Sequence, residues 1–150
     1  MDKKRCSELI KEYIILPTHS LGQNFLIDDG AAESIVDAAG IDRSEEVLEI
    51  GPGLGALTEK LSDKASQVYA VEIDAHLMDA LHAVLDEKKN VRIIHSDFLK
   101  LSKKSIRQDK TSGYKIVSNL PYYVMTPIMI KLFREWDDAS AMVFTVENAA

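Results

Sequence analysis

The chain has 150 residues, of which 46% are hydrophobic and 28% charged, as is ordinary for a folded globular protein. One domain of this length can bury a sizeable core. The net charge of −6 argues mildly against a nucleic-acid surface, because clustered lysine and arginine drive phosphate binding. Two basic stretches, within residues 3–5 and 100–110, are interpreted first as solvated surface and do not decide the matter.

No apolar run approaches the roughly 20 residues of a membrane helix, and the charged N-terminus lacks the apolar centre of a secretory signal. The single cysteine, Cys6, excludes an internal disulfide framework and suits the cytosol. No Cys/His cluster has metal-ligand spacing. We therefore expect a cytoplasmic monomer with neither a membrane nor a metal partner.

Short β-branched runs alternate with helical patterns, which is typical of a parallel α/β sheet. In chain order, the predicted elements are a helix at Asp29–Ala39, a strand at Val47–Ile50, a helix at Ala56–Ala65, a strand at Val68–Glu72, a helix at Ala75–Asp86, strands at Val91–Ile94 and Lys115–Val117, a helix opening at Thr126-Pro127, and a strand at Ala141–Val146. This order predicts a Rossmann-like, doubly wound parallel sheet. The pattern ends on its fifth strand, so we expect the sheet to be incomplete and the chain to stop inside a larger protein.

The last predicted helix carries explicit boundary signals. Thr126 is expected as its N-cap, with Pro127 at the first helical position. Its predicted apolar stripe is Ile128, Leu132 and Phe133.

A glycine-rich loop, Gly51-Pro52-Gly53-Leu54-Gly55, follows the first predicted strand. Glycines here let the backbone approach a ligand closely, and the N-terminus of the following helix favours polar groups. The spacing is G-x-G-x-G, whereas dinucleotide sites have G-x-G-x-x-G, and Pro52 removes an N–H that a pyrophosphate could use. Gly51, Gly53 and Gly55 therefore indicate a nucleoside ligand without phosphates; a merely tight turn is the alternative.

Two acidic residues are expected at the same edge of the sheet as the loop. Glu72 ends the second predicted strand, 21 residues after Gly51, where a carboxylate can accept hydrogen bonds from both hydroxyls of a ribose. Asp74 is the better candidate for capping the next helix. Asp97 follows the third predicted strand and could accept a hydrogen bond from the exocyclic amine of an adenine, with Phe98 beside it. Taken alone, Asp97 is equally consistent with an ordinary turn residue.

The segment Ser118-Asn119-Leu120-Pro121-Tyr122-Tyr123 follows the fourth predicted strand. An adenine amine is a poor nucleophile, because its lone pair is delocalised into the ring. The Asn119 side-chain oxygen and the Leu120 carbonyl could accept from its N–H groups and orient the amine towards a methyl group. Pro121 stiffens the turn, and Tyr122 offers a face on which an extruded base can stack. The alternative is that Asn119-Leu120-Pro121 forms an ordinary turn and that Tyr122 belongs to the hydrophobic core.

These motifs together resemble the small-subunit ribosomal RNA adenine dimethyltransferases, over about residues 21–143. The shared segments are Leu21-Gly22-Gln23-Asn24-Phe25-Leu26, Leu48-Glu49-Ile50-Gly51-Pro52-Gly53-Leu54-Gly55, Glu72-Ile73-Asp74, Ser96-Asp97-Phe98 and Asn119-Leu120-Pro121-Tyr122-Tyr123. The resemblance implies S-adenosylmethionine as cofactor. It also implies transfer of two methyl groups to each of two adjacent adenines near the 3′ end of 16S-type RNA, in an immature 30S-type subunit.

The predicted site follows from the motifs and the resemblance together. The predicted cofactor-binding residues are Gln23, Asn24, Leu26, Gly51, Gly53, Gly55, Glu72, Ile73, Asp97, Phe98 and Asn119. The predicted catalytic residues are Asn119, Leu120, Pro121 and Tyr122. The role of residues 23–26 as a lid over the cofactor rests on the resemblance alone, because their own pattern indicates only a loop before a helix.

The sequence also departs from the family pattern. Phe144-Thr145-Val146-Glu147 stands where the family more often has a Gln-Lys-Glu-like run. The family's two further strands and its C-terminal helical RNA-binding domain are expected to be absent. Residues 1–20 are thus predicted to form a basic, helical extension and residues 21–150 an incomplete S-adenosylmethionine-binding domain, which by itself should methylate RNA poorly.

Three other functions remain as alternatives. The 23S ribosomal RNA adenine methyltransferases of macrolide resistance share the loop and the acids, but Leu120, the Tyr122-Tyr123 pair and Thr126-Pro127 favour the small-subunit group. A nicotinamide-dependent oxidoreductase is disfavoured because its glycine fingerprint is absent. The third alternative is an RNA assembly factor that binds the cofactor without catalysis.

Overall fold

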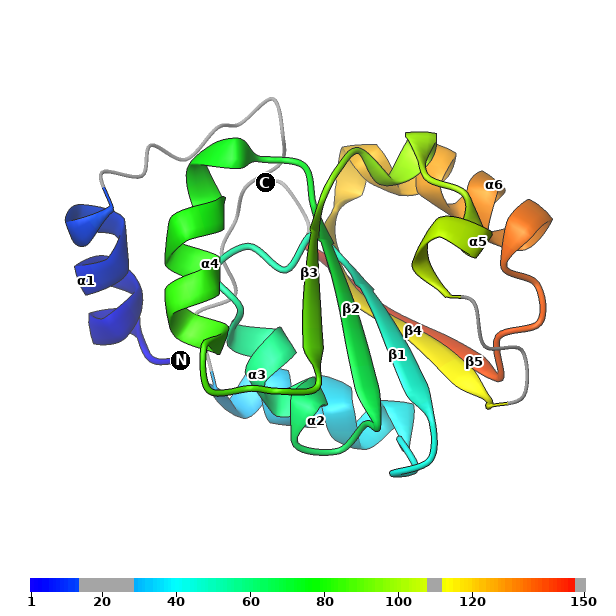
Figure 1. Cartoon of the computed structure of the whole chain (residues 1–150), viewed down its shortest axis with the longest axis horizontal. Coiled ribbons are helices and arrows are strands. Elements are labelled where there is room, and N and C mark those ends of the chain that lie inside the picture. The colour runs from blue at the N-terminus through cyan, green and yellow to red at the C-terminus, as the bar shows by residue number, and fades with distance from the viewer. Residues whose placement is uncertain (14–28, 108–111, 148–150) are drawn as a thin grey trace.

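The computed structural model describes residues 1–13, 29–107 and 112–147. Its strands are parallel neighbours in one sheet of order β3-β2-β1-β4-β5 (Figure 1). They are β1 (Glu46–Ile50), β2 (Gln67–Glu72), β3 (Val91–His95), β4 (Tyr114–Pro121) and β5 (Ala141–Glu147). This confirms the predicted doubly wound sheet. Strand β4 is longer than predicted, because residues 118–121 remain paired with β5.

Helices connect the strands and cover both faces of the sheet. They are α1 (Lys3–Glu12), α2 (Asp29–Ala39), α3 (Ala56–Ser62), the 3-10 turn η2 (Ala75–Leu77), α4 (Met78–Leu85), the 3-10 turn η3 (Phe98–Lys100), α5 (Lys103–Ile106), the 3-10 turn η4 (Tyr122–Val124) and α6 (Met125–Glu135). The bounds of α2 are as predicted, whereas α3 ends three residues before Ala65. Within the described ranges, no helix is long and apolar enough to cross a membrane.

The helix predicted at Ala75–Asp86 is divided in two. Asp74 is the N-cap, as predicted, and its carboxylate accepts from the N–H of His76 at 2.9 Å. The first turn after this cap is the tight 3-10 turn η2, and regular α-helix begins only at Met78.

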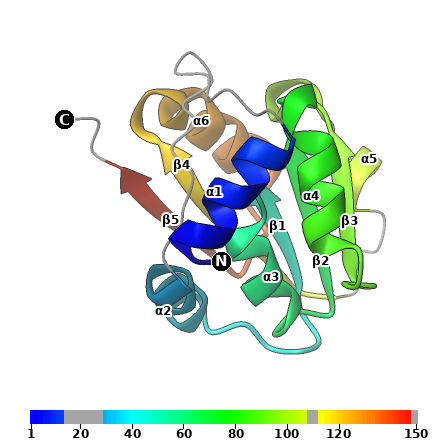
Figure 2. The same ribbon diagram turned by 90° about the vertical axis from the view of Figure 1, so that its left-hand side faces the viewer.

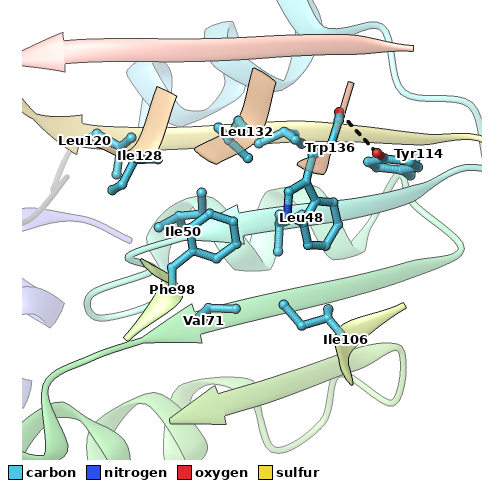
Figure 3. Packing of buried hydrophobic residues seen from close by; sticks show 11 residues of the cluster. Leu48, Ile50, Val71, Phe98, Ile106, Tyr114, Leu120, Ile128, Leu132 and Trp136 are labelled. Atoms are coloured by element: carbon cyan, nitrogen blue, oxygen red, sulfur yellow. Dashed lines mark hydrogen bonds between the residues drawn. The ribbon is translucent and has the colours of Figure 1, made fainter. Parts of the chain in front are cut away.

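Alternation along the strands sends side chains to two separate cores. Val47, Val68 and Val117 pack beneath α2 and α3, on what we call the α2 face. Leu48 and Ile116 point to the opposite side, the α6 face, where they pack with side chains of α5 and α6. Figure 3 shows Leu48 in this cluster with Ile106 and Leu132. Both faces of the sheet are therefore covered, as near-continuous apolar strands require.

The helix α1 forms an outer layer over α3 and α4 (Figure 2). Its buried residues, Cys6 and Leu9, pack with Leu54 and Leu77. The basic residues 3–5 lie on the exposed side of this helix. The remainder of the predicted N-terminal extension lies outside the described residues.

The helix α6 begins one residue before its predicted N-cap. Val124 stands at the cap position without a side-chain cap hydrogen bond, because the turn η4 already winds the chain before the helix begins. The prediction of Thr126 as N-cap is therefore wrong, since Thr126 is inside the helix. Pro127 still falls in the first turn of the helix. Proline is tolerated there because the N–H groups of the first turn have no acceptor within the helix, so the missing N–H of Pro127 breaks no hydrogen bond.

The apolar stripe of α6 is narrower than predicted. Ile128 and Leu132 are buried against the α6 face of the sheet, in the cluster that also holds Trp136 (Figure 3). Phe133 is 64% exposed, so its assignment to the stripe is wrong. It directly follows the buried Leu132, and one helical step of about 100° turns its side chain away from the sheet.

Gly55 joins the glycine loop to α3, and both its backbone conformation and its surroundings require a glycine. Its φ of +87° lies in the left-handed region, which side chains rarely adopt. A Cβ on it would also lie 3.1 Å from a methyl group of Leu81 in α4. The loop and α4 can therefore approach one another only because no side chain stands between them.

We predict that Gly55→Ala lowers the free energy of unfolding by about 1–3 kcal/mol, the cost of backbone strain with crowding added. Urea denaturation followed by circular dichroism measures this change. Gly113→Ala is the control, because a Cβ there meets its nearest neighbour at an ordinary 3.8 Å and no left-handed φ is required. Equal losses in the two variants would contradict the prediction.

Candidate active site

A pocket of about 280 Å³ opens where the carboxyl ends of β1, β2 and β4 meet the start of α6. It is lined by Ile50, Gly51, Val71, Glu72, Ile73, Ser96, Asp97, Phe98, Leu99, Leu120, Pro121, Tyr123, Val124, Pro127 and Ile128. Strands β2 and β3 lie on one side of β1, and β4 and β5 lie on the other. The pocket is thus at the switch point of the sheet, where doubly wound folds bind ligands.

The pocket unites part of the predicted site. The predicted residues that line it are Gly51, Glu72, Ile73, Asp97, Phe98, Leu120 and Pro121. Those outside this lining are Gly53, Gly55, Asn119 and Tyr122. The predicted lid residues Gln23, Asn24 and Leu26 lie outside the described residues.

Hydrogen bonds fasten the glycine loop to the end of β2. The N–H of Gly51 donates to the carbonyl of Val71 at 2.8 Å, and that of Gly53 donates to Oε2 of Glu72 at 2.9 Å. Both glycines have positive φ, +72° and +60°. The loop is thereby fixed beside the end of β2, with Gly51 in the lining of the pocket.

Glu72 is a buried carboxylate, only 4% exposed, at the junction of the loop and the pocket. Its second oxygen, Oε1, accepts from the N–H of Asp74 at 3.1 Å. Burial raises the pKa of Glu72, and the N–H donors of Gly53 and Asp74 oppose that rise. The N–H of Ile73 is a third backbone donor to this carboxylate, and at least one of its four lone-pair sites remains for a hydroxyl donor from a ligand.

Asp97 is a turn residue, which was the alternative considered for it, and it also lies at the pocket. Its carboxylate caps η3 by accepting from the N–H of Leu99 at 3.0 Å, and it also lines the pocket. Phe98 is 4% exposed and packs with Trp136, ring centroids 6.0 Å apart, so most of its surface belongs to the core. Ile73, 46% exposed, offers a larger apolar surface at the pocket rim.

The segment Ser118–Pro121 is part of β4, so the prediction that it follows the strand is wrong. The reason is the pairing with β5, which continues through Pro121 after the pairing with β1 has ended. Strand alternation then separates the two predicted catalytic neighbours. The side chain of Leu120 is buried on the α6 face, whereas Asn119 shares the α2 face with Val117.

The two tyrosines after β4 are both exposed, at 66% for Tyr122 and 49% for Tyr123. Tyr123 lines the pocket, and Tyr122 lies beyond its rim at the start of η4. A core role for Tyr122 is therefore excluded, and its ring is accessible for stacking.

Glu49 is a buried acid that the motif analysis left without a role. It is 1% exposed in the middle of the sheet, and the hydroxyl of Thr58 in α3 donates to its Oε2 at 2.6 Å. Burial raises its pKa to about 8, the Thr58 hydrogen bond opposes the rise, and the nearby charge of Glu72 adds to it. An acid inside the apolar run Val47–Ile50 was the sequence signal that could have identified it.

Ser118 is a second residue that sequence reasoning did not single out. It is fully buried, and its hydroxyl accepts from the N–H of Ile50 at 2.8 Å. No local pattern marks this role, since it depends on two strands that are 68 residues apart in the chain. Among the described residues, no group of three or more His, Cys, Asp or Glu side chains is placed to hold a metal ion.

Comparison with known proteins identifies the family. A family model described as ribosomal RNA adenine dimethylase matches residues 17–150. The chain belongs to this family. Its relatives include the ribosomal RNA small subunit methyltransferases A of Listeria welshimeri, 42% identical over 96% of this chain, and of Clostridium botulinum, 39% identical over 94% of it.

Solved structures of the dimethylase family and of related methyltransferases have the same fold. A dimethyladenosine transferase from Plasmodium falciparum gives a TM-score of 0.69 at 25% identity, covering 83% of this chain and 44% of that one. The 23S rRNA methyltransferase ErmE gives 0.69 at 27% identity, covering 83% of this chain and 48% of that one. The chain spans about half the length of its curated relatives, 50% for the Listeria protein and 51% for the Clostridium protein.

We predict that the free energy of unfolding falls as pH rises from about 4.5 to about 8, because of Glu49. The folded state retains the proton on this acid over that range, whereas the unfolded state releases it near the ordinary value of 4.5. Its stabilising contribution is therefore complete below pH 4.5 and is lost as pH rises through 8. Glu49→Gln, which has no proton to release, should remove this part of the pH dependence.

Denaturation of both proteins at several pH values between 5 and 9 measures the difference. Glu45→Gln is the matched control at the other end of the sheet, because Lys115 and the N–H of Asp42 lower the pKa of Glu45 against the effect of its burial. The contribution of Glu45 is lost only as pH falls towards the acid range. Parallel pH profiles for the wild type and Glu49→Gln between pH 5 and 9 would refute the assignment.

Proposed function

We propose that this chain binds S-adenosylmethionine at the carboxyl edge of its sheet, as the cofactor-binding part of an enzyme that dimethylates adenine N6 in small-subunit ribosomal RNA. The observation that carries the proposal is the position of Glu72. Its buried carboxylate lines the pocket and is tied to the glycine loop by the N–H of Gly53. A nucleoside whose ribose hydroxyls bond to Glu72 would lie directly beside that loop.

The described residues fit the parts of this cofactor. Glu72 would accept hydrogen bonds from the ribose hydroxyls, and Asp97, after the neighbouring strand, would accept one from the adenine amine. Ile73 would cover a face of the base. Gly51, which is exposed, leaves backbone space for the methionine part. The predicted contacts of Asn24 and Leu26 belong to the same proposal.

When bound, the cofactor supplies an electrophilic methyl group. The residues of the chain would then hold the target amine. The carbonyl of Leu120 and Oδ1 of Asn119 would accept its two N–H groups, so that the nitrogen lone pair is directed at the methyl group. The chain would thereby orient the amine for the methyl transfer that the cofactor supplies, and the proton that the nitrogen gives up would pass to water. The exposed ring of Tyr122 would stack on the extruded base.

The small-subunit substrate is preferred over the 23S alternative on the strength of the relatives. Curated relatives named for the small subunit are 42% and 39% identical to the chain, against 27% for the 23S enzyme ErmE. The proposed partner is therefore an immature 30S-type subunit in the cytoplasm, bound by a monomer.

The basic stretch at residues 100–110 can contribute less to RNA binding than its charge indicates. Arg107 is buried and donates to Glu46 at 2.6 Å, and Lys103 forms an ion pair with Asp138. Lys100 and Lys104 are exposed. Together with residues 3–5 on α1, these two lysines are the candidates for phosphate contacts among the described residues of the two stretches.

We predict that the chain binds S-adenosylmethionine or its demethylated product, and that Glu72→Gln weakens binding by about 1–3 kcal/mol, the range for buried polar partners left unpaired. Isothermal titration calorimetry measures both affinities, with circular dichroism as the test of folding. The control is Glu87→Gln in the exposed turn that follows α4, which should bind as the wild type does. A folded wild-type chain that does not bind at millimolar ligand would remove the central claim.

A second prediction separates catalysis from binding. Asn119→Ala should reduce methyl transfer roughly 100-fold, the usual cost of removing one preorganised polar group from a transition state. Cofactor affinity should change far less. Transfer is measured in a single turnover, with radiolabelled cofactor and undermethylated small subunits. Equal losses of rate and affinity would make Asn119 chiefly a cofactor ligand.

A further inference from the structure

The side chain of Asn119 has one protein partner that the motif analysis did not anticipate. The hydroxyl of Thr145, in β5, donates a hydrogen bond to Oδ1 of Asn119. The two residues are direct partners in the parallel register of β4 and β5. The contact therefore spans the outer pair of strands, which lie side by side at one edge of the sheet (Figure 1).

Strand alternation accounts for this contact. In β5, Val143 packs into the core of the α2 face, whereas Met142 and Phe144 pack on the α6 face. Thr145, two residues after Val143, consequently points to the α2 face. Asn119 points to the same side of β4, so the register places the hydroxyl and the amide next to each other.

We propose that Thr145 is a positioning residue that fixes the orientation of the Asn119 amide for methyl transfer. This inference rests on the proposed function, in which Oδ1 of Asn119 accepts an N–H of the target adenine. The Thr145 hydroxyl occupies one of the two lone pairs of Oδ1 and leaves the other for the substrate.

The need for such a residue follows from the amide itself. The χ2 torsion of asparagine is broad and nearly two-fold, so the amide can turn by about 180° at little cost. The turned amide would present its NH₂ group where the amine of the substrate also carries N–H, and two donors repel. A hydroxyl donor at Oδ1 disfavours that orientation. Thr145 suits the role because β-branching restricts its χ1 and thereby fixes the hydroxyl.

Two substitutions separate the hydroxyl from the shape of the side chain. Thr145→Val removes the donor and keeps the branching, whereas Thr145→Ser keeps the donor. Thr126→Val is the matched control, because it makes the same chemical change at an exposed site in the first turn of α6. The first measurement is nuclear magnetic resonance of the Asn119 side-chain NH₂ group, whose signals are assigned by their loss in Asn119→Asp.

The side-chain amide should be rigid in the wild type, in Thr145→Ser and in Thr126→Val. In Thr145→Val, we expect its order parameter to fall from near the rigid value of about 0.85 to about 0.6 or below. An order parameter that does not change in Thr145→Val would overturn the inference, because the hydroxyl would then not hold the amide.

The second measurement is the single-turnover rate of methyl transfer, with protein in excess over undermethylated small subunits so that weak RNA binding does not mask the chemical step. Thr145→Val should be slower by about tenfold, the worth of one ordinary hydrogen bond, with cofactor affinity within about twofold. Thr145→Ser should restore most of the rate, and Thr126→Val should match the wild type.

The outcomes separate this inference from the proposed function. A mobile amide with an unchanged rate would overturn the positioning role while leaving the methyltransferase function intact. A folded wild-type chain that does not bind the cofactor would contradict the function itself, and the catalytic part of this inference with it. The amide signals would then report only a structural contact between the two strands.

Discussion

Strands β1 and β4 are paired from Glu46 with Tyr114 to Leu48 with Ile116, and then they separate. Beyond that point the N–H of Ile50 donates to the hydroxyl of Ser118, so a side chain takes the place of the backbone ladder. A buried N–H without a partner would cost about 1–3 kcal/mol, and the serine removes this cost where the strands diverge. The divergence opens the switch point of the sheet, and the loop, the acids and the pocket are all arranged around it.

Two acidic side chains are buried beside the switch point of the sheet. Glu49 and Glu72 are 1% and 4% exposed, and burial raises the pKa of both. Their stabilising partners come from the glycine loop and the helix that follows it: the N–H of Gly53 for Glu72, and the hydroxyl of Thr58 for Glu49. The glycine loop is therefore both a wall of the site and a source of the hydrogen bonds that make a buried carboxylate tolerable there.

Strand alternation determines which groups can act together. In β4, Leu120 anchors the strand in the core beneath α6, and Asn119 is directed to the opposite face. An adenine hydrogen-bonded to both residues would have to lie across the carboxyl end of β4. It would contact the backbone carbonyl of Leu120 at the edge of the sheet and the side-chain amide of Asn119 on the α2 face. This explains why the pocket lining includes Leu120 and Pro121 but not Asn119.

Local sequence was sufficient for the existence of the five strands, for most of the helices and for the edge of the sheet at which the pocket lies. Short β-branched runs predicted each strand, and helical periodicity predicted the bounds of α2. The glycine loop, Glu72 and Asp97 were expected at one edge because parallel strands bring their carboxyl ends together. These predictions succeed because each depends on residues close in the chain. The tertiary structure alone decided the extension of β4 through Pro121, the bond between Ser118 and Ile50, the contact of Thr145 with Asn119, and the raised pKa of Glu49. Each depends on strand register or on burial between distant segments, which no local pattern records.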